Sequence, residues 1–555
     1  MRTVCKYTPN ELFAGFGTTC TVLDGMAHDL DESDSMAHAN LCGFGKTLIQ
    51  TSLRGEAEPL LLVNCCDTMR RAYDVIVHAV TGPGGGKRPF TYLMELPHTC
   101  SPCQIEAFAH ELKHLKDAYA RATGLTFDLA ACQAAFAPRH AIEEPYVGIM
   151  GVRCGRELEQ FIRRTFDMPV TNLTCTGNRS PHMDSAALET DDEDAFFAAY
   201  AQALLGQIPC MRMHDTTGRR ALFEDPRLRA VIYHCMKFCD FYGPEYAQFK
   251  RHSSLPLLRI ESDFTLQSSE QLHTRIEAFA ETIAPKKDAS APKARSSGTT
   301  YVAGIDSGST STDVVILDEM GAVVASAIIP TGGGAQKSAE ECLSHALAQA
   351  GISRTAIRSV VSTGYGRSYI DEGDDSVTEI TCHAKGAHSI DPSVRTIIDI
   401  GGQDSKVIRI DNAGNVQDFA MNDKCAAGTG RFLEMMARAL DLPLEEMSRM
   451  GVDHKEDIVI SSMCSVFAES EVVNLVAQNR AIPDIVWGID NSVANKIGTL
   501  VRRVGGRESY MMTGGVAQNA GVVRAIERKL GCKVHVSESA QLCGALGAAL
   551  FALER

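Results

Sequence analysis

The spacing of apolar residues predicts that strands and helices alternate along both halves of the chain. In the N-terminal half, apolar runs predict strands within 58–66, 89–97 and 230–240, and an amphipathic stretch at 111–124 predicts a helix. In the C-terminal half, 301–329 contains strand-like runs with a turn at Glu319–Gly321. Such alternation is typical of α/β domains with parallel sheets, so we expect this fold class in both halves.

One stretch, 284–300, breaks this pattern. It is rich in Pro, Ala, Ser and Lys and has no large apolar residue, as expected for a flexible linker. A chain of 555 residues is also longer than one hydrophobic core usually supports. We therefore expect an N-terminal α/β domain at 1–283, a linker at 284–300 and a C-terminal domain at 301–555.

Charge and composition exclude several classes of function. The formal net charge of −15 argues against nucleic-acid binding, and no apolar run is long enough to span a membrane. The N-terminal residues lack the pattern of a secretory signal, so we expect a cytoplasmic protein. In a reducing compartment, many of the 19 cysteines are better explained as metal ligands or core residues than as disulfides. The scattered histidines, including His383, are expected to be surface or satisfied core residues.

Three glycine-rich turns in the C-terminal half provide phosphate-binding chemistry. They lie at 304–312, between two predicted strands, at 399–404, after a predicted strand, and at 512–519. Turns of Gly, Ser and Thr present backbone N–H groups and hydroxyls to a phosphate, and Asp306 can hold hydrated Mg²⁺. Paired glycines let the backbone approach an adenosine closely. The GxxxxGK[ST] phosphate loop is absent, because TGPGGGKR at 81–88 lacks a hydroxyl residue after Lys87.

In order and spacing, the three turns resemble those of the actin-like ATPase superfamily, which includes sugar kinases and chaperone ATPases. The resemblance implies two ribonuclease-H-like α/β lobes that close on ATP and Mg²⁺. We expect Asp306, Asp399 and Gln403 to be catalytic, with Gln403 orienting the attacking water. The residues expected to bind the nucleotide are Ser307, Gly308, Ser309, Thr310, Thr312, Gly401, Gly402, Gly514, Gly515 and Gln518.

Two cysteines between the second and third turns distinguish this chain from a kinase. Cys425 and Cys464 precede stretches at 432–442 and 466–478 that predict helices, so we expect both at helix N-termini, where the dipole favours thiolates and anionic clusters. A 4Fe–4S cluster usually takes four cysteines, and a symmetric dimer would supply two from each copy. Two buried structural thiols are the alternative. The cysteines expected in the core are Cys342, Cys382, Cys532 and Cys543.

The motifs NDKCAAGTGRF (422–432) and SSMCSVFAESEV (461–472), between IDIGGQDSK and MMTGGVAQN, closely resemble the activators of 2-hydroxyacyl-CoA dehydratases and benzoyl-CoA reductases, the BadF/BadG/BcrA/BcrD ATPases. The resemblance runs from Tyr301 to about Leu553. It implies that Cys425 and Cys464 bind one 4Fe–4S cluster between two subunits. It also implies that ATP binding and hydrolysis lower the cluster potential, so that one electron passes to a partner.

In the N-terminal half, Cys42, Cys66 and Cys239 lie at or near predicted strand ends, which converge at a crevice in parallel sheets. Three convergent thiolates could hold a cubane, and buried thiols are the alternative. The segments NCCDTMRRAYD and AVIYHCMKFCD resemble catalytic subunits of 2-hydroxyacyl-CoA dehydratases and double-cubane-cluster reductases over roughly 5–283. By position the resemblance makes these three cysteines cluster ligands. The additional cysteines, which a second cubane could use, are Cys65, Cys175, Cys210 and Cys235.

The sequence therefore predicts a fused activator and electron acceptor. The C-terminal ATPase would form a homodimer, take an electron from ferredoxin or flavodoxin, and use ATP to pass it to the N-terminal cluster or to separate dehydratase or reductase subunits. A small-molecule kinase of the same fold, and an ATP-dependent scaffold that docks subunits or delivers clusters, are the alternatives.

Overall fold

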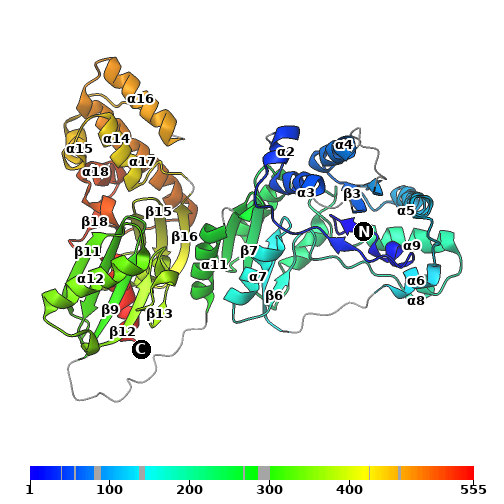
Figure 1. Cartoon of the computed structure of the whole chain (residues 1–555), viewed down its shortest axis with the longest axis horizontal. Helices are drawn as coiled ribbons and strands as arrows, with labels where there is room; N and C mark the ends of the chain where they lie inside the picture. The colour runs from blue at the N-terminus through cyan, green and yellow to red at the C-terminus, as the bar shows by residue number, and fades with distance from the viewer. Residues whose placement is uncertain are drawn as a thin grey trace. The chain divides into compact units, whose positions relative to one another are not determined.

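The computed structural model describes residues 1–555 apart from 39, 55–57, 81–88, 137–143, 267–268, 285–299, 424 and 461–463. The chain forms two compact units, Met1–Ile283 and Ala284–Arg555 (Figure 1). The expected linker at 284–300 falls almost wholly on residues outside the described ones, as does the glycine-rich stretch at 81–88. None of the described helices is long and apolar enough to cross a membrane.

The first unit contains two four-stranded sheets in which every pair of neighbouring strands is parallel. One sheet has the order β2 (Thr21–Val22), β1 (Arg2–Thr3), β3 (Leu60–Asn64), β4 (Thr91–Glu95). The other has the order β6 (Val170–Asn172), β5 (Tyr146–Gly151), β7 (Leu228–Met236), β8 (Leu257–Ser262). The prediction of parallel sheets here is confirmed, and β3, β4 and β7 fall where apolar runs predicted strands.

Helices flank these sheets and enclose one continuous apolar core. The predicted helix at 111–124 is the C-terminal part of α5 (Pro102–Thr123), which packs against α9 (Glu193–Leu205). The remaining helices are α1 (Asn10–Ala14), α2 (Asp31–Met36), α3 (Gly43–Arg54), α4 (Asp67–Val80), α6 (Leu129–Ala134), α7 (Arg156–Thr165), α8 (Ser185–Leu188), α10 (Gly243–His252) and α11 (Ser269–Ile283).

The second unit repeats one sheet topology twice. Its first sheet has the order β11 (Val323–Pro330), β10 (Ser311–Leu317), β9 (Tyr301–Ser307), β12 (Ile357–Thr363), β13 (Asp375–Ser376). Its second has the order β16 (Val416–Asn422), β15 (Ser405–Ile410), β14 (Thr396–Ile400), β17 (Tyr510–Thr513), β18 (Val534–Val536). In each sheet, antiparallel hairpins join the first three strands in sequence and the last two add in parallel. These are the two lobes of the actin-like fold, so the predicted fold class is confirmed.

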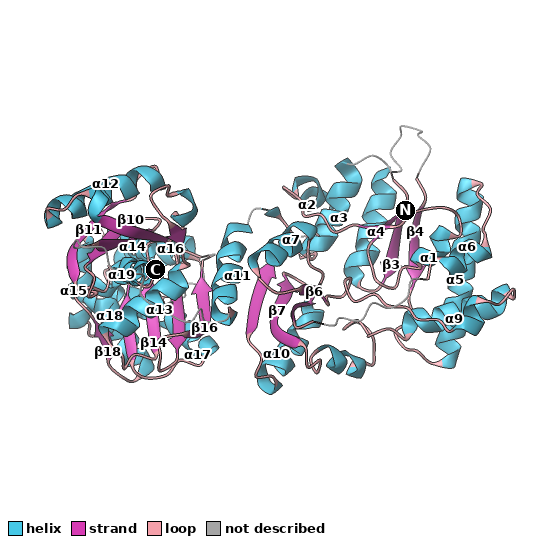
Figure 2. Cartoon of the chain, turned by 90° about the horizontal axis from the view of Figure 1, so that it is seen from below, coloured by secondary structure: helices cyan, strands magenta, loops and turns pink. Residues whose placement is uncertain are grey.

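Strand alternation explains why helices cover both faces of the first of these sheets. α12 (Ala335–Ala350) and α19 (Cys543–Leu553) cover opposite faces of this sheet (Figure 2). Ala303 and Ile305 of β9 pack toward α12, whereas Val302 packs toward α19. Successive residues of a strand point to opposite faces, and apolar residues at successive positions therefore bury both faces. The other helices of this unit are α13 (Glu379–Ile390), α14 (Gly430–Ala439), α15 (Leu444–Met450), α16 (Ser465–Ala477), α17 (Ile482–Val504) and α18 (Ala520–Leu530).

Candidate functional site

The three predicted turns line one cavity of about 760 Å³ in the second unit. The first turn joins β9 to β10, the second joins β14 to β15, and the third follows β17, so equivalent strand ends of the two lobes face the same space. Of the predicted site residues, the cavity is lined by Asp306, Gly308, Ser309, Thr310, Asp399, Gly401, Gly402, Gly514, Gly515 and Gln518.

Three predicted residues do not line this cavity. Ser307 and Thr312 are fully buried, and the Thr312 hydroxyl is within hydrogen-bonding distance of Thr331 and Ser338 beneath α12. Strand alternation explains their position, because Ser311 and Asp313, on either side of Thr312, face the cavity instead. Gln403 is exposed next to Gly402. Ser307 and Thr312 thus face away from the cavity in this structure, and their role in nucleotide binding stays a prediction.

The third turn fits closely against the second. Gly514 has φ of +80°, a conformation that L residues rarely adopt. A Cβ added at Gly514 would lie 2.5 Å from the carbonyl oxygen of Ile400 and 2.7 Å from Oδ1 of Asp399. Glycine is thus required here both by the backbone conformation and by the close approach of two turns of the same lobe, which follow the paired strands β14 and β17.

Lys406 is the central charge of the cavity, and sequence reasoning missed it. It is buried on β15, with Nζ 2.7 Å from Oδ2 of Asp404, 3.3 Å from Oδ2 of Asp399 and 3.4 Å from Oε1 of Glu379. Its signal in the sequence was a lysine beside the apolar positions of the strand SKVIRI, because a lysine buried there needs compensating carboxylates. Lys406 thereby fixes the positions of acids from β14, from the turn between β14 and β15, and from α13.

His383, expected to be a surface or satisfied core residue, is buried with Thr513 as a hydrogen-bond partner, and it also faces the cavity. It lines the cavity from α13, with Nε2 3.9 Å from Oδ2 of Asp306 and Nδ1 3.7 Å from Oδ1 of Asp399. Burial opposes ionisation of Asp399, but His383 and Lys406 outweigh it and hold the pKa of this carboxyl below its ordinary value. Asp399 is therefore an anion at neutral pH.

Two further acids of the cavity, Asp306 and Asp313, lie outside this group around Lys406. Burial, followed by the neighbouring Asp306, raises the pKa of Asp313 to about 8, and burial raises the pKa of Asp306 as well. Oδ1 of Asp313 is buried without a hydrogen-bond partner. Mg²⁺ prefers carboxylate oxygens together with phosphate and water. The donor set of this cavity therefore fits the magnesium ion that accompanies a nucleotide.

The pKa of Asp313 predicts a pH dependence of stability in nucleotide-free protein. Its folded pKa of about 8 is above the unfolded value of 3.8, so between these values the folded state binds a proton that the unfolded state has lost. This contribution favours folding most at low pH and is lost as pH rises toward 8. Asp313→Asn should therefore gain stability relative to wild type, by about 1 kcal/mol or more between about pH 5 and pH 8. Denaturant unfolding of both proteins at these two pH values measures the free energy of unfolding. The same difference between variant and wild type at both pH values would contradict the prediction.

Cys425 and Cys464 come shortly before α14 and α16, two helices that pack against each other. Cys464 is the N-cap of α16, as predicted. The prediction for Cys425 was wrong, because α14 begins at Gly430 with Thr429 as its N-cap, and Cys425 lies four residues earlier in a turn. The side chain of Asn422 donates to the Cys425 carbonyl at 2.9 Å and fixes this turn. Both cysteines are half-buried and outside any disulfide, and α14 packs against α16. Cys342, Cys382 and Cys543 are buried as expected, whereas Cys532 is half-buried.

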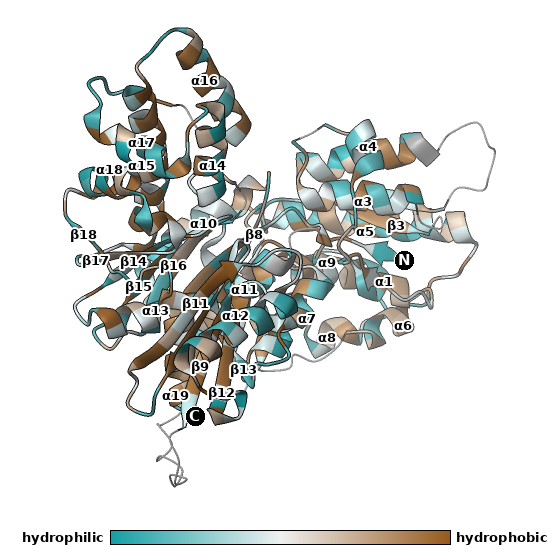
Figure 3. Ribbon diagram, turned by 60° about the vertical axis from the view of Figure 1, so that its left-hand side comes forward, coloured by the Kyte–Doolittle hydropathy of each residue, from teal (hydrophilic) through white to brown (hydrophobic). Residues whose placement is uncertain are grey.

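The helix that begins at Cys464 exposes an apolar surface. Phe467 is 74% exposed, and hydrophobic positions occur along the length of α16 (Figure 3). Its exposed apolar residues are Val466, Phe467, Val473 and Val476. A contiguous apolar surface of this kind is typical of a protein–protein contact.

The N-terminal cysteines gather around one cavity. Cys42, Cys66 and Cys239 lie there as the resemblance implied, but Cys42 precedes α3 and does not follow a strand. The full set of cysteines that line this cavity is Cys5, Cys42, Cys65, Cys66, Cys175, Cys210 and Cys239. Cys5 was missed, and Cys235 is not part of the lining. No group of three or more His, Cys, Asp or Glu among the described residues is arranged for a single metal ion.

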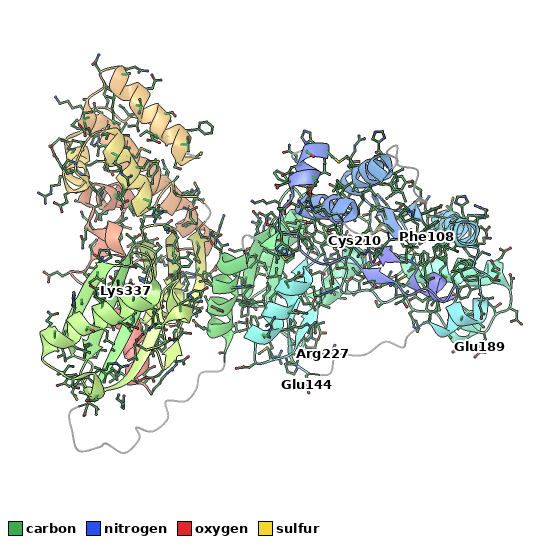
Figure 4. The ribbon with its side chains drawn as sticks, viewed as in Figure 1. Phe108, Glu144, Glu189, Cys210, Arg227 and Lys337 are labelled. Carbon is green, nitrogen blue, oxygen red and sulfur yellow. The ribbon has the colours of Figure 1, made fainter. Side chains whose placement is uncertain are left out.

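Buried cations surround this cysteine cavity. Arg212 points Nη1 and Nη2 at the sulfur atoms of Cys210, labelled in Figure 4, and Cys239, at 3.7 and 3.8 Å. Its Nε is buried without a partner. Arg153 also lines the cavity, and Lys6 lies close by, donating to Asn178 and to the Ile208 carbonyl. Positive charge around convergent sulfur atoms fits an anionic iron–sulfur cluster.

These cations change the acidity of the thiols unequally. Burial opposes ionisation of Cys210, yet Arg212 and the Tyr242 hydroxyl outweigh it and hold the pKa of this thiol below its ordinary value. Burial raises the pKa of Cys42, and it raises that of Cys239 to about 12. The thiols of this cavity therefore differ in acidity, and metal binding here would release protons from those that are protonated.

The two halves of the chain match two different protein families. A model of the BadF/BadG/BcrA/BcrD ATPase family matches residues 303–552, and a model of 2-hydroxyglutaryl-CoA dehydratase, D-component, matches 5–144 and 138–283. The 2-hydroxyisocaproyl-CoA dehydratase activator of Clostridioides difficile is 44% identical over 254 residues, covering 46% of this chain and 95% of that protein. The activator of lactoyl-CoA dehydratase of Anaerotignum propionicum is 45% identical over 254 residues, covering 46% and 98%. The solved structure of the 2-hydroxyisocaproyl-CoA dehydratase activator from Clostridium difficile with bound ADPNP aligns with a TM-score of 0.44 and 44% identity, covering 46% of this chain and 95% of that one.

Proposed function

The chain belongs to the BadF/BadG/BcrA/BcrD ATPase family through residues 303–552 and to the 2-hydroxyglutaryl-CoA dehydratase D-component family through residues 5–283, and we propose that it uses ATP to drive low-potential electrons to a dehydratase-type acceptor. The donor would be ferredoxin or flavodoxin. The acceptor would be the fused N-terminal half or a separate dehydratase or reductase subunit.

The observation that carries this proposal is the combination of a phosphate cavity with Cys464 at the start of a helix. The second turn of the cavity, 401–404, hydrogen-bonds to the start of α14, because the N–H groups of Gly430 and Arg431 donate to Gly401 and Gly402. α14 packs in turn against α16, which begins at Cys464. A shift of the second turn around a bound γ-phosphate therefore has a short mechanical path to both cysteines.

In this proposal Cys425 and Cys464 of two copies hold one 4Fe–4S cluster, which supplies one-electron redox chemistry when bound. The exposed apolar residues of α16, directly after Cys464, support a twofold contact between copies, because covering them would remove Phe467 and Val466 from water. Asp399 and Asp306 would hold the hydrated Mg²⁺. Gln403, exposed beside Gly402, is free to turn toward a water that attacks the γ-phosphate.

The cysteine cavity of the N-terminal unit is the proposed acceptor. Cys42, Cys66 and Cys239 would hold a cluster there, and Cys5, Cys65, Cys175 and Cys210, which line the same cavity, would be the ligands of a larger or second cluster. The buried guanidinium of Arg212 would stabilise each added electron by its charge.

Arg212→Gln should make reduction of this N-terminal cluster harder. Loss of one charge at about 5 Å, with an effective dielectric constant of about 20, costs about 2–3 kcal/mol, or roughly 100 mV per electron. A redox titration followed by electron paramagnetic resonance measures the midpoint potential. Arg227→Gln, which removes an exposed cation of the same unit, is the control and should leave the midpoint unchanged. Equal midpoints in wild type and Arg212→Gln would contradict this role.

The test of the function is whether ATP moves electrons. Full-length protein isolated without oxygen and reduced with a limiting amount of dithionite would be mixed with Mg–ATP or with Mg–ADPNP. Electron transfer should occur with Mg–ATP and not with Mg–ADPNP, the non-hydrolysable analogue. A change in the iron–sulfur resonances would report it. Identical spectra with and without ATP would contradict the proposal and favour a docking scaffold, and appearance of a phosphorylated small molecule would favour a kinase.

A further inference from the structure

A second thiol motif lies outside both sites described above. Residues 100–103 read Cys-Ser-Pro-Cys and follow β4 at the start of α5. Ser101 is the N-cap of this 22-residue helix, Pro102 occupies its first position, and Cys103 lies in its first turn. Both thiols are free and exposed. Two cysteines separated by two residues at a helix start can close a disulfide with little change of backbone, because residues three apart share one turn.

The surroundings of this pair favour reactive thiolates. The first turn of α5 contains no acidic residue, so nothing in it opposes the positive end of the helix dipole. The exposure of both cysteines to solvent gives their sulfur atoms access to other thiols and disulfides. These features are those of a redox-active pair, whereas structural cysteines are usually buried.

Two other roles for the pair are disfavoured. The described residues hold no group of three or more His, Cys, Asp or Glu arranged for a metal ion, which argues against a metal site around His98, Cys100 and Cys103. A structural disulfide is not needed to hold α5, because Phe108, labelled in Figure 4, and Leu112 are fully buried on it.

We propose that Cys100 and Cys103 form a redox-active dithiol that undergoes thiol–disulfide exchange with thiols and disulfides outside the protein. With glutathione disulfide as oxidant, the Cys100 thiolate attacks one sulfur atom and releases one glutathione thiolate. The Cys103 thiolate then attacks the mixed disulfide and releases the second. The two cysteines are oxidised to one disulfide, and one glutathione disulfide is reduced to two glutathiones. A dithiol reductant reverses both steps.

The location links this pair to the cysteine cavity of the same unit. The N–H group of His214 donates to the carbonyl of His98 at 2.9 Å, just before the motif. His214 belongs to the segment that carries Cys210 and Arg212. The exchange site and the cavity thus share one hydrogen-bonded pair of segments, which places the pair close in the fold to two residues of the cavity lining.

The test is the thiol state of the full-length protein in glutathione buffers of stepped redox potential. After acid quenching and alkylation, the peptide that contains both cysteines should lose the mass of two hydrogen atoms as the buffer becomes more oxidising, and dithiothreitol should restore it. Alkylation of the pair at pH 7 should be about tenfold faster than that of the half-buried Cys532.

Single variants separate the two thiols. Cys103→Ser should trap glutathione on Cys100, whereas Cys532→Ser, the control, should leave the disulfide of the pair intact. Both motif residues are exposed, so serine at either position should not affect folding. The proposal is overturned if the pair stays reduced in the most oxidising buffer, if wild type accumulates two glutathiones on the peptide, or if the peptide retains a bound metal that blocks alkylation.

Discussion

Asp399→Asn is expected to lower the rate of ATP hydrolysis by about 100-fold or more. Asp399 is the ionised acid of the cavity, at 3.3 Å from Lys406 and accepting a hydrogen bond from Thr513 at 3.1 Å. Its negative charge is placed to hold Mg²⁺ where charge develops on the phosphate, and removing one such electrostatic group typically costs 10²–10³ in rate, roughly 3–4 kcal/mol. Asparagine has the same shape, so the nucleotide cavity should keep its form.

The fold should survive this change because Lys406 keeps two partners. Asp404 lies 2.7 Å and Glu379 3.4 Å from its Nζ, so the ammonium is not left alone. Phosphate release measures turnover, and circular dichroism checks the fold. Asp371→Asn makes the same chemical change at an exposed position of the same unit and should retain wild-type turnover. A rate for Asp399→Asn within about twofold of wild type would contradict the assignment.

Phe467→Asp is expected to dissociate the proposed dimer. Phe467 is the most exposed of the apolar residues on α16, and an aromatic anchor at the centre of an interface commonly contributes about 2 kcal/mol or more. The dimer dissociation constant should therefore rise at least about 30-fold. Because Cys464 lies three residues earlier, iron bound in the ATPase half should be lost with the dimer.

Analytical ultracentrifugation and iron determination on oxygen-free protein measure both effects. The matched control is Met320→Asp, which places the same charge on an exposed apolar residue of the turn between β10 and β11. This control should remain dimeric and keep its iron. A Phe467→Asp protein with unchanged mass and iron would show that α16 is not the contact.

Features encoded in short stretches could be predicted from the sequence. The turns at 304–312 and 399–404 could be recognised because glycines and an aspartate, joined in the first turn by Ser and Thr, occur together between two apolar runs, and the strands on either side follow from those runs. It was harder to predict which residues of the first turn face the cavity. Ser307 and Thr312 belong to the strands themselves, and strand alternation turns them away from the cavity.

Features that depend on tertiary proximity could not be predicted. Cys5 and Cys65 are 60 residues apart, yet both follow parallel neighbours, β1 and β3, so the same sheet edge brings them together. Lys406 was missed because its partners come from three elements. Cys425 was placed on a helix because an apolar pattern follows it, but Gly428, with φ of +92°, forms a turn before α14 begins.

The central claim is that Cys425 and Cys464 of two copies together hold one 4Fe–4S cluster. The direct measurement is the amount of iron per chain in full-length wild type and in the Cys425→Ser, Cys464→Ser double variant, both isolated without oxygen. Cys532→Ser serves as the control for loss of a half-buried thiol. The account predicts that the double variant contains about two fewer irons per chain than wild type or the control. Equal iron and an unchanged cluster resonance in the double variant would contradict it.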